Sequence, residues 1–167
     1  LLSSTEDSLY VKFGTVEVYA DINFICNKND QLKIKLAIEN CDKNFRVTEI
    51  VGPNLYGLQL GTDYQKNVLI YPHHAGEKTI NPVERYKKED YQSFWRAKTS
   101  LTSYDTYHRQ INYCGLASMT FMYLYNEVSG LYFGSHDLSF PVTGVVAEVG
   151  AKQNFMGLSY VKYHDLV

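Results

Sequence analysis

The stretch VEVYADINF, from Val16 to Phe24, alternates apolar and polar side chains along its whole length. A side-chain period of two is typical of a β-strand that buries only one face. After the polar turn NKND, the run LKIKLAIEN from Leu32 to Asn40 repeats this alternation, with lysines among its polar residues. Two amphipathic strands joined by a short polar loop predict an antiparallel hairpin with one face in solvent.

Further short runs with the character of strands follow this hairpin. They are FRVTEIV (45–51), VLIYP (68–72), the pair around the turn NEVSG (119–125 and 131–133), VTGVVAEVG (142–150) and FMGLSYVKYHDLV (155–167), with a weaker candidate at 93–104. Spacing of this kind predicts about eight or nine strands and no amphipathic helix. We therefore expect an all-β fold, a large antiparallel β-sandwich, with residues 1–167 forming a single domain.

Two stretches are expected to interrupt the strands. Gly52-Pro53-Asn54 should end the strand over 45–51, because proline cannot donate a hydrogen bond to a ladder. The polar stretch 73–92 is expected to be a long functional loop or an excursion over the surface.

Composition excludes several classes of partner. The 167 residues carry 16 basic and 18 acidic side chains, and no basic block is present, so nucleic acid is not expected. No apolar run reaches the roughly 18 residues of a membrane span. Most of the 15 tyrosines are interpreted as strand residues, although a tyrosine ring also suits a sugar-contacting surface.

The cysteines and the first residues lead to two further expectations. Cys26, Cys41 and Cys114 have no metal-binding spacing, and we expect three buried thiols, with one disulfide as the alternative. Because the sequence opens on LLSSTEDS without a methionine, it is interpreted as a fragment of a longer multidomain chain.

Two histidine pairs are the chemical candidates. His73 and His74 follow a proline, and Glu77 could join them only if the loop curled back; neighbours on an extended chain point to opposite sides, so no metal site is predicted. His136 and Asp137 could form an acid–base pair, but an Asx-type turn made by Asp137 is favoured. No phosphate loop and no nucleophile elbow is present, so neither a cofactor nor a catalytic residue is predicted.

Three segments occur in an order that resembles a known family. They are NFRVTEIVGPNLYGLQLG, VLIYPHHAGEKTINP and SMTFMYLYNEVSGLYFGSHD, within residues 44–137. This order resembles the N-terminal β-supersandwich domain, galactose-mutarotase-like, of bacterial glycoside hydrolases related to endo-α-N-acetylgalactosaminidases.

The resemblance implies a non-catalytic sandwich that packs on a C-terminal (β/α)₈ catalytic barrel and helps to shape its glycan-binding cleft. In such enzymes the catalytic carboxylates lie on the barrel, whereas this sequence ends at KYHDLV without a barrel pattern, so the chain alone is not expected to be catalytic. The parent protein would be extracellular, on the cell surface or periplasmic. The residues expected to contact a glycan are Trp95, His73, His74, Glu77, His136 and Asp137.

Two alternatives remain open. The chain could be a free-standing carbohydrate-binding module, in which Trp95 and tyrosines form an exposed platform, or a cell-surface interaction sandwich with no sugar role. Trp95 itself is either an anchor in the core or a stacking platform.

Overall fold

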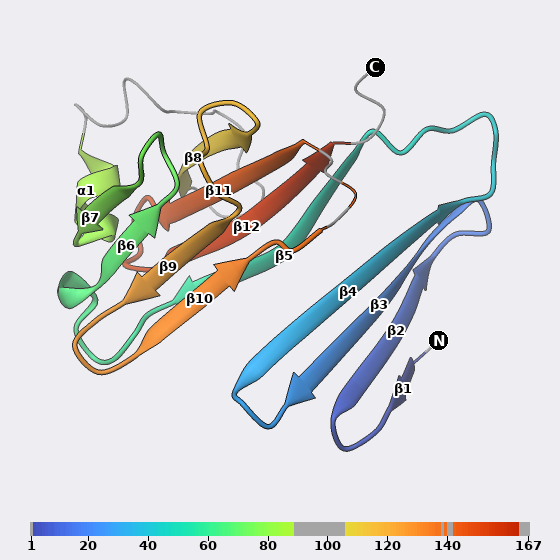
Figure 1. Cartoon of the computed structure of the whole chain (residues 1–167), viewed down its shortest axis with the longest axis horizontal. Coiled ribbons are helices and arrows are strands. Elements are labelled where there is room, and N and C mark those ends of the chain that lie inside the picture. The colour runs from blue at the N-terminus through green and yellow to red at the C-terminus, as the bar shows by residue number, and fades with distance from the viewer. Residues whose placement is uncertain (1, 89–105, 138, 140–141, 164–167) are drawn as a thin grey trace. The chain divides into compact units, whose positions relative to one another are not determined.

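The computed structural model of the chain describes residues 2–88, 106–137, 139 and 142–163 (Figure 1). It consists almost entirely of antiparallel strands, so the all-β prediction is confirmed. The chain divides into two compact units, Leu1–Val47 and Thr48–Val167. The single domain predicted over 1–167 stays a prediction, and each unit is described by itself.

The first unit is one four-stranded antiparallel sheet in the order β1-β2-β3-β4. Its strands are β1 (Leu2–Ser4), β2 (Ser8–Gly14), β3 (Val18–Asn27) and β4 (Gln31–Asn40). The predicted hairpin is confirmed as β3 and β4, which pair from Val18↔Asn40 to Asn27↔Gln31. Sequence reasoning missed β1 and β2, because β1 is only three residues long and the alternation in β2 is brief.

The second unit contains two four-stranded antiparallel sheets. One has the order β10-β9-β6-β7, built from Gly130–Gly134, Phe121–Tyr125, Val68–Tyr71 and Glu77–Ile80. The other has the order β5-β12-β11-β8, built from Glu49–Leu58, Met156–Tyr163, Thr143–Gly150 and Thr106–Tyr113. A 3-10 turn (Tyr64–Lys66) and the helix α1 (Pro82–Lys87) complete it.

The inner faces of these two sheets form the core of a β-sandwich. Leu69, Met122 and Leu124 of the first sheet belong to the same buried cluster as Val145 and Leu158 of the second. Burial of alternate residues from both sheets is the usual construction of a sandwich core.

Two buried tyrosines also connect the sheets of the second unit. The Tyr71 hydroxyl donates to the carbonyl of Val145 at 2.7 Å, and the Tyr160 hydroxyl donates to the carbonyl of Phe133 at 2.7 Å. Buried hydroxyls need such partners, so these bonds allow tyrosine in an otherwise apolar core.

The predicted break at Gly52-Pro53-Asn54 is wrong, because β5 runs through it. Among the described strands, β5 lies at the edge of its sheet, where its one neighbour is β12. The register shifts between Ser159↔Asn54 and Val161↔Val51, so the segment containing Pro53 lies at an irregularity of the ladder. Edge strands and bulges are the places where a sheet tolerates a residue that cannot donate.

The long loop predicted at 73–92 is also corrected. The segment 73–92 contains the strand β7 and the helix α1. The prediction that the chain has no helix is therefore also wrong. Asn81 caps α1 by accepting from the backbone N–H of Glu84, and Pro82 begins the helix. These cap signals were readable, but four strand residues and six helix residues are too few to show a period. The weak strand predicted at 93–104 lies outside the described residues.

The three cysteines differ from the expectation of buried thiols. Cys26, Cys41 and Cys114 are all exposed and free. Cys26 and Cys41 lie at strand ends of the first unit, and Cys114 lies in a turn after β8. Strand ends and turns lie at the rim of a sheet, so the described residues leave all three thiols exposed.

Candidate functional site

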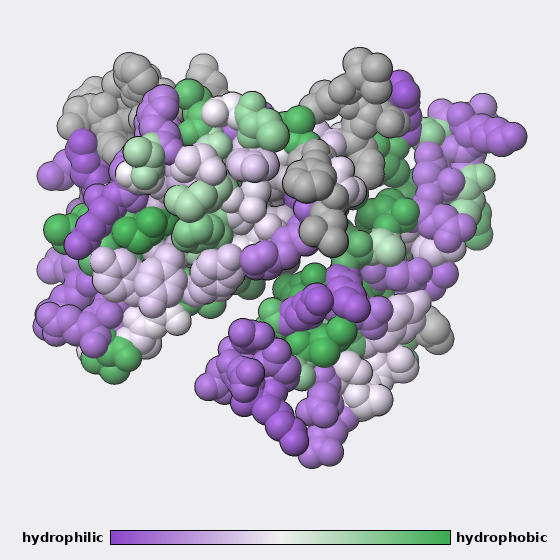
Figure 2. Space-filling model, viewed as in Figure 1, coloured by the Kyte–Doolittle hydropathy of each residue, from purple (hydrophilic) through white to green (hydrophobic). Residues whose placement is uncertain are grey.

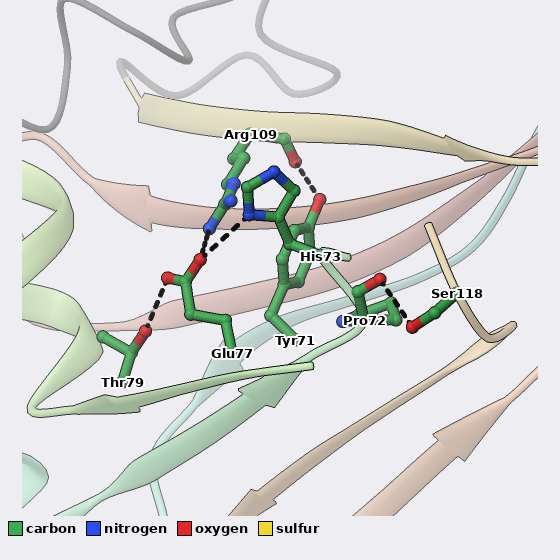
Figure 3. Close-up of polar contacts among 7 residues, drawn as sticks. All are labelled: Tyr71, Pro72, His73, Glu77, Thr79, Arg109 and Ser118. Carbon is green, nitrogen blue, oxygen red and sulfur yellow. Dashed lines mark hydrogen bonds and ion pairs between the residues drawn. The ribbon is translucent and has the colours of Figure 1, made fainter. Parts of the chain in front are cut away.

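A polar cluster lies where the chain turns from β6 into β7 (Figure 3). His74 adopts a left-handed backbone conformation with φ of 51°, and the Gly76 N–H donates to the carbonyl of His73 at 2.9 Å. This tight turn brings Glu77 back, so that its Oε2 lies 3.4 Å from Nδ1 of His73. The loop therefore curls back, and Glu77 does join His73.

Arg109 of β8 is the member of this cluster that sequence reasoning missed. Its Nη1 donates to Oε2 of Glu77 at 2.9 Å, and its guanidinium lies 4.5 Å from the centre of the Tyr71 ring. The Thr79 hydroxyl donates to the other oxygen of Glu77 at 3.1 Å. In Figure 3, dashed lines join one carboxylate oxygen of Glu77 to both His73 and Arg109. Because Arg109 comes from the opposite sheet, this ion pair ties the two layers together.

The surroundings of His73 lower the pKa of its imidazole. Burial lowers its pKa first, and the charges of Arg109 and His74 lower it further, against the opposing effect of Glu77. The rings of His73 and His74 lie 4.1 Å apart, so they do not point to opposite sides as predicted. The prediction assumed an extended chain, whereas His74 has left-handed backbone. Among the described residues no group of three or more His, Cys, Asp or Glu side chains could hold a metal ion.

A second polar cluster surrounds Glu148 of β11, which is fully buried. Its carboxylate accepts from the Tyr56 hydroxyl at 2.8 Å and from the Thr106 hydroxyl at 2.7 Å. His108 is its register neighbour on β8 and is also buried. Burial lowers the pKa of His108, although the charge of Glu148 opposes this effect. The two hydroxyls provide hydrogen-bond partners for both oxygens of this buried carboxylate, which is a structural role.

His73, which is partly buried, and His108, which is buried, predict a stability that falls in mild acid. Their folded pKa values lie below the ordinary 6.5, so the unfolded chain binds protons first as the pH drops below about 6.5. Each histidine then costs up to about 1.4 kcal/mol of stability per pH unit until its folded pKa is reached. Urea unfolding between about pH 7.5 and 5.5 should show this loss. The double variant His73→Gln/His108→Gln should flatten the dependence; a slope equal to that of the wild type would contradict the prediction.

An aromatic strip covers the outer face of β9 and β10. We define this strip as Phe121, Tyr123, Tyr125, Tyr132 and His136. Tyr123 and Tyr132 are a cross-strand pair with exposed fractions of 37% and 51%. The intervening residues Met122 and Leu124 point into the core and are fully buried. In Figure 2 the surface over β9 and β10 is pale, the colour of weakly polar residues such as tyrosine.

The ring contacts within the strip form two groups, Tyr123 with Tyr125 and Tyr132 with Phe121 and His136. The centres of the Tyr123 and Tyr125 rings lie 5.2 Å apart, with an angle of 18° between their planes. Tyr132 lies 5.4 Å from Phe121 and 6.0 Å from His136 by the same measure. These distances fall in the range in which aromatic pairs stabilise each other. The strip is therefore a supported surface of rings and not a set of separate exposed side chains.

Glycines allow the tyrosine rings to lie down on the sheet. A Cβ placed on Gly130 would lie 2.7 Å from Cζ of Tyr123, and one placed on Gly134 would lie 2.6 Å from Cε1 of Tyr132. Each ring therefore occupies the space above a glycine on the same face of the sheet. A ring that lies along the sheet turns one of its faces outward, which makes the strip broad and low.

His136 and Asp137 do not form an acid–base pair. Nε2 of His136 lies 3.3 Å from the Tyr132 hydroxyl, at the end of the strip. Oδ1 of Asp137 accepts from the N–H of Ser139 at 2.9 Å, which is the favoured Asx-type turn. The other oxygen lies 3.5 Å from Nζ of Lys162. The hydrogen bonds from Ser139 and the charge of Lys162 together lower the pKa of Asp137.

The structure thus distributes the predicted contact residues over two places. His73, His74 and Glu77 meet at the β6–β7 turn, and His136 and Asp137 follow β10; Trp95 lies outside the described residues. Sequence reasoning did not assign the tyrosines of the strip, although Phe121, Tyr123 and Tyr125 alternate with apolar residues along β9. That alternation was a readable signal for an aromatic outer face.

Comparison with known proteins finds no family model, no curated protein and no solved structure that matches this chain. Any function inferred for this chain therefore rests on the geometry of its own residues. No helix among the described residues has the length and apolar character needed to cross a membrane.

Proposed function

We propose that the second unit is a glycan-binding β-sandwich module and that the aromatic strip is its binding surface. The observation that carries this proposal is the pair of exposed tyrosine rings, Tyr123 and Tyr132, which lie along the sheet above Gly130 and Gly134. The apolar C–H face of a sugar ring packs on a flat aromatic ring of this kind. Tyrosine hydroxyls and the imidazole of His136 lie at the edges of the rings, where sugar hydroxyls can form hydrogen bonds.

Binding without catalysis is the form of this function that the described residues support best. The carboxylate next to the strip, Asp137, is engaged by Ser139 and Lys162. Glu77 and Glu148 are held by Arg109 and by two hydroxyls, respectively. A glycosidase needs one carboxylic acid to donate a proton and a second carboxylate to act as nucleophile or base, and all three of these carboxylates have fixed structural partners.

The wider setting belongs to the same proposal. The resemblance of residues 44–137 to the sandwich domains of glycoside hydrolases suggests that the module serves a carbohydrate-active protein and lies beside a catalytic barrel. The test for this part is a hydrolysis assay with the isolated chain and with a longer form of the protein. Activity in the longer form alone would support it, and activity in this chain alone would contradict it.

Removal of one ring should abolish most of the binding. We expect Tyr132→Ala to weaken glycan binding at least about tenfold, because it deletes the most exposed tyrosine ring of the strip and the contact of that ring with His136. The measurement is a glycan array displaying galactose-, N-acetylgalactosamine- and glucose-terminated glycans, followed by calorimetric titration of the best binder. Phe45→Ala is the matched control, because Phe45 is a similarly exposed ring (60%) outside the second unit.

A glycine variant tests the same surface without deleting a ring. In Gly130→Ala the new Cβ must displace the end of the Tyr123 side chain, which can swing away while the strand stays in place. We expect weaker glycan binding and an unchanged circular dichroism spectrum. If no glycan on the array binds the wild-type chain, or if both Tyr132→Ala and Gly130→Ala bind as well as the wild type, the strip is not the binding surface.

A further inference from the structure

We propose that the apolar face of the first unit is a self-association surface that joins two copies of this chain. The ladders place apolar residues of neighbouring strands side by side: Phe13 pairs with Ala20, Val11 with Ile22, and Leu9 with Phe24. Strand β4 continues these rows with Ile38, Leu36 and Ile34. We define the apolar face as Leu9, Val11, Phe13, Ala20, Ile22, Phe24, Leu32, Ile34, Leu36 and Ile38. This inference is independent of the glycan-binding strip.

This face has no second layer within its own unit. Phe13, Leu32 and Leu36 have exposed fractions of 58%, 56% and 40%, and Ala20 is the one buried residue among the described residues of the unit. A sheet that is apolar on one face is stable only when that face packs against another element. An open apolar surface of this extent marks an interaction site.

The charges of the unit show what kind of surface the partner must offer. The opposite face carries Lys12, Asp21, Lys33, Lys35 and Glu39, whereas the apolar face as defined above carries no charge. A charged partner surface would lose its hydration here without gaining an opposite charge. The partner must therefore present an uncharged apolar surface of its own.

A second copy of the chain supplies such a face. Within the second unit, the described apolar inner faces of the two sheets already bury each other in one core. The first unit of another copy has the same composition and the same dimensions, and an isologous pair buries the same patch on both sides. Two such sheets packed face to face form an ordinary β-sandwich with an apolar interior.

The size of the face suits a weak, reversible pair. The three strands that carry it, β2, β3 and β4, have seven, ten and ten residues. With about 3.3 Å of rise per residue and about 4.8 Å between strands, their part of the sheet plane measures on the order of 400 Å². Two copies then bury on the order of 900 Å², which is the size of a transient interface.

The test is the oligomeric state of the full 167-residue chain. We expect sedimentation velocity to show a dimer at micromolar concentration. Leu36→Glu should raise the dimer dissociation constant at least about a hundredfold, because it buries an unpaired charge at the interface. Lys35→Glu is the matched control, since Lys35 is the neighbouring residue on the charged face of the same strand and its change should leave the dimer intact.

Two results would overturn the proposal. One is a monomeric wild-type chain over the whole concentration range, which would mean that the apolar face does not join copies of the chain. The other is a dimer that persists in both Leu36→Glu and Phe13→Lys, which would mean that the copies meet through a different surface. Phe13→Lys serves as the second variant because Phe13 is the most exposed residue of the apolar face, so its change disturbs the fold least. Glycan binding would be unaffected by any of these outcomes.

Discussion

We expect Glu77→Ala to lower the free energy of unfolding of the second unit by about 3 kcal/mol. The side chain of Arg109 is only 2% exposed, and its Nη1 donates to Glu77 at 2.9 Å. Removal of the carboxylate leaves a buried guanidinium without this partner, and breaking one side of a buried ion pair is far more costly than losing an exposed pair. The loss should appear as a lower midpoint in urea unfolding followed by circular dichroism.

A double variant shows how much of the loss comes from leaving the charge of Arg109 without the carboxylate of Glu77. Glu77→Leu/Arg109→Leu removes both charges, so it should recover part of the stability that Glu77→Ala loses. Lys78→Ala, at the next residue of β7, is exposed and should change the stability by less than about 0.5 kcal/mol. A loss below about 1 kcal/mol in Glu77→Ala would show that the pair does not hold the sheets together.

Leu158→Ala should cost about 3 kcal/mol for a different reason. Leu158 lies in β12, is fully buried and belongs to the core cluster between the two sheets of the second unit. Truncation removes its burial from water and leaves a cavity that strands held in two ladders cannot close, since β12 pairs with both β11 and β5. Urea unfolding measures the loss, with an unchanged m-value expected.

The control for Leu158→Ala is Val128→Ala, a change at a highly exposed residue. Val128 is 93% exposed in the turn between β9 and β10, and Val128→Ala should be neutral within about 0.5 kcal/mol. If Leu158→Ala were as mild as Val128→Ala, the two sheets would not share the tightly packed core described here.

The predictable part of the fold consists of strands with a sustained alternation. The hairpin of β3 and β4 could be read from the sequence because a period of two persists along both strands. The strands β9, β11 and β12 could be read as short apolar runs bounded by turn residues. Strand β8 was missed because Arg109 interrupts its apolar pattern. An arginine is acceptable at that position only because Glu77 lies opposite it in the folded unit.

The candidate sites were predictable to a smaller degree. The turn at His73 and Glu77 was recognised as a possible meeting point, and the Asx turn of Asp137 was predicted. The aromatic strip was not, because a count of tyrosines does not say which of them share a face or lie over glycines. That information depends on the register between β9 and β10.

The sequence by itself determined the all-β class and the amphipathic hairpin. It also determined which face of each hairpin strand is apolar and which is polar, since this follows from the local period of side chains. Only the tertiary structure decided which faces are covered. It placed the apolar inner faces of the second unit against each other, paired buried Arg109 with Glu77 across the layers, and left the aromatic strip and the apolar face of the first unit open. The physical reason is that burial and pairing depend on contacts between residues far apart in the chain, which no local pattern records.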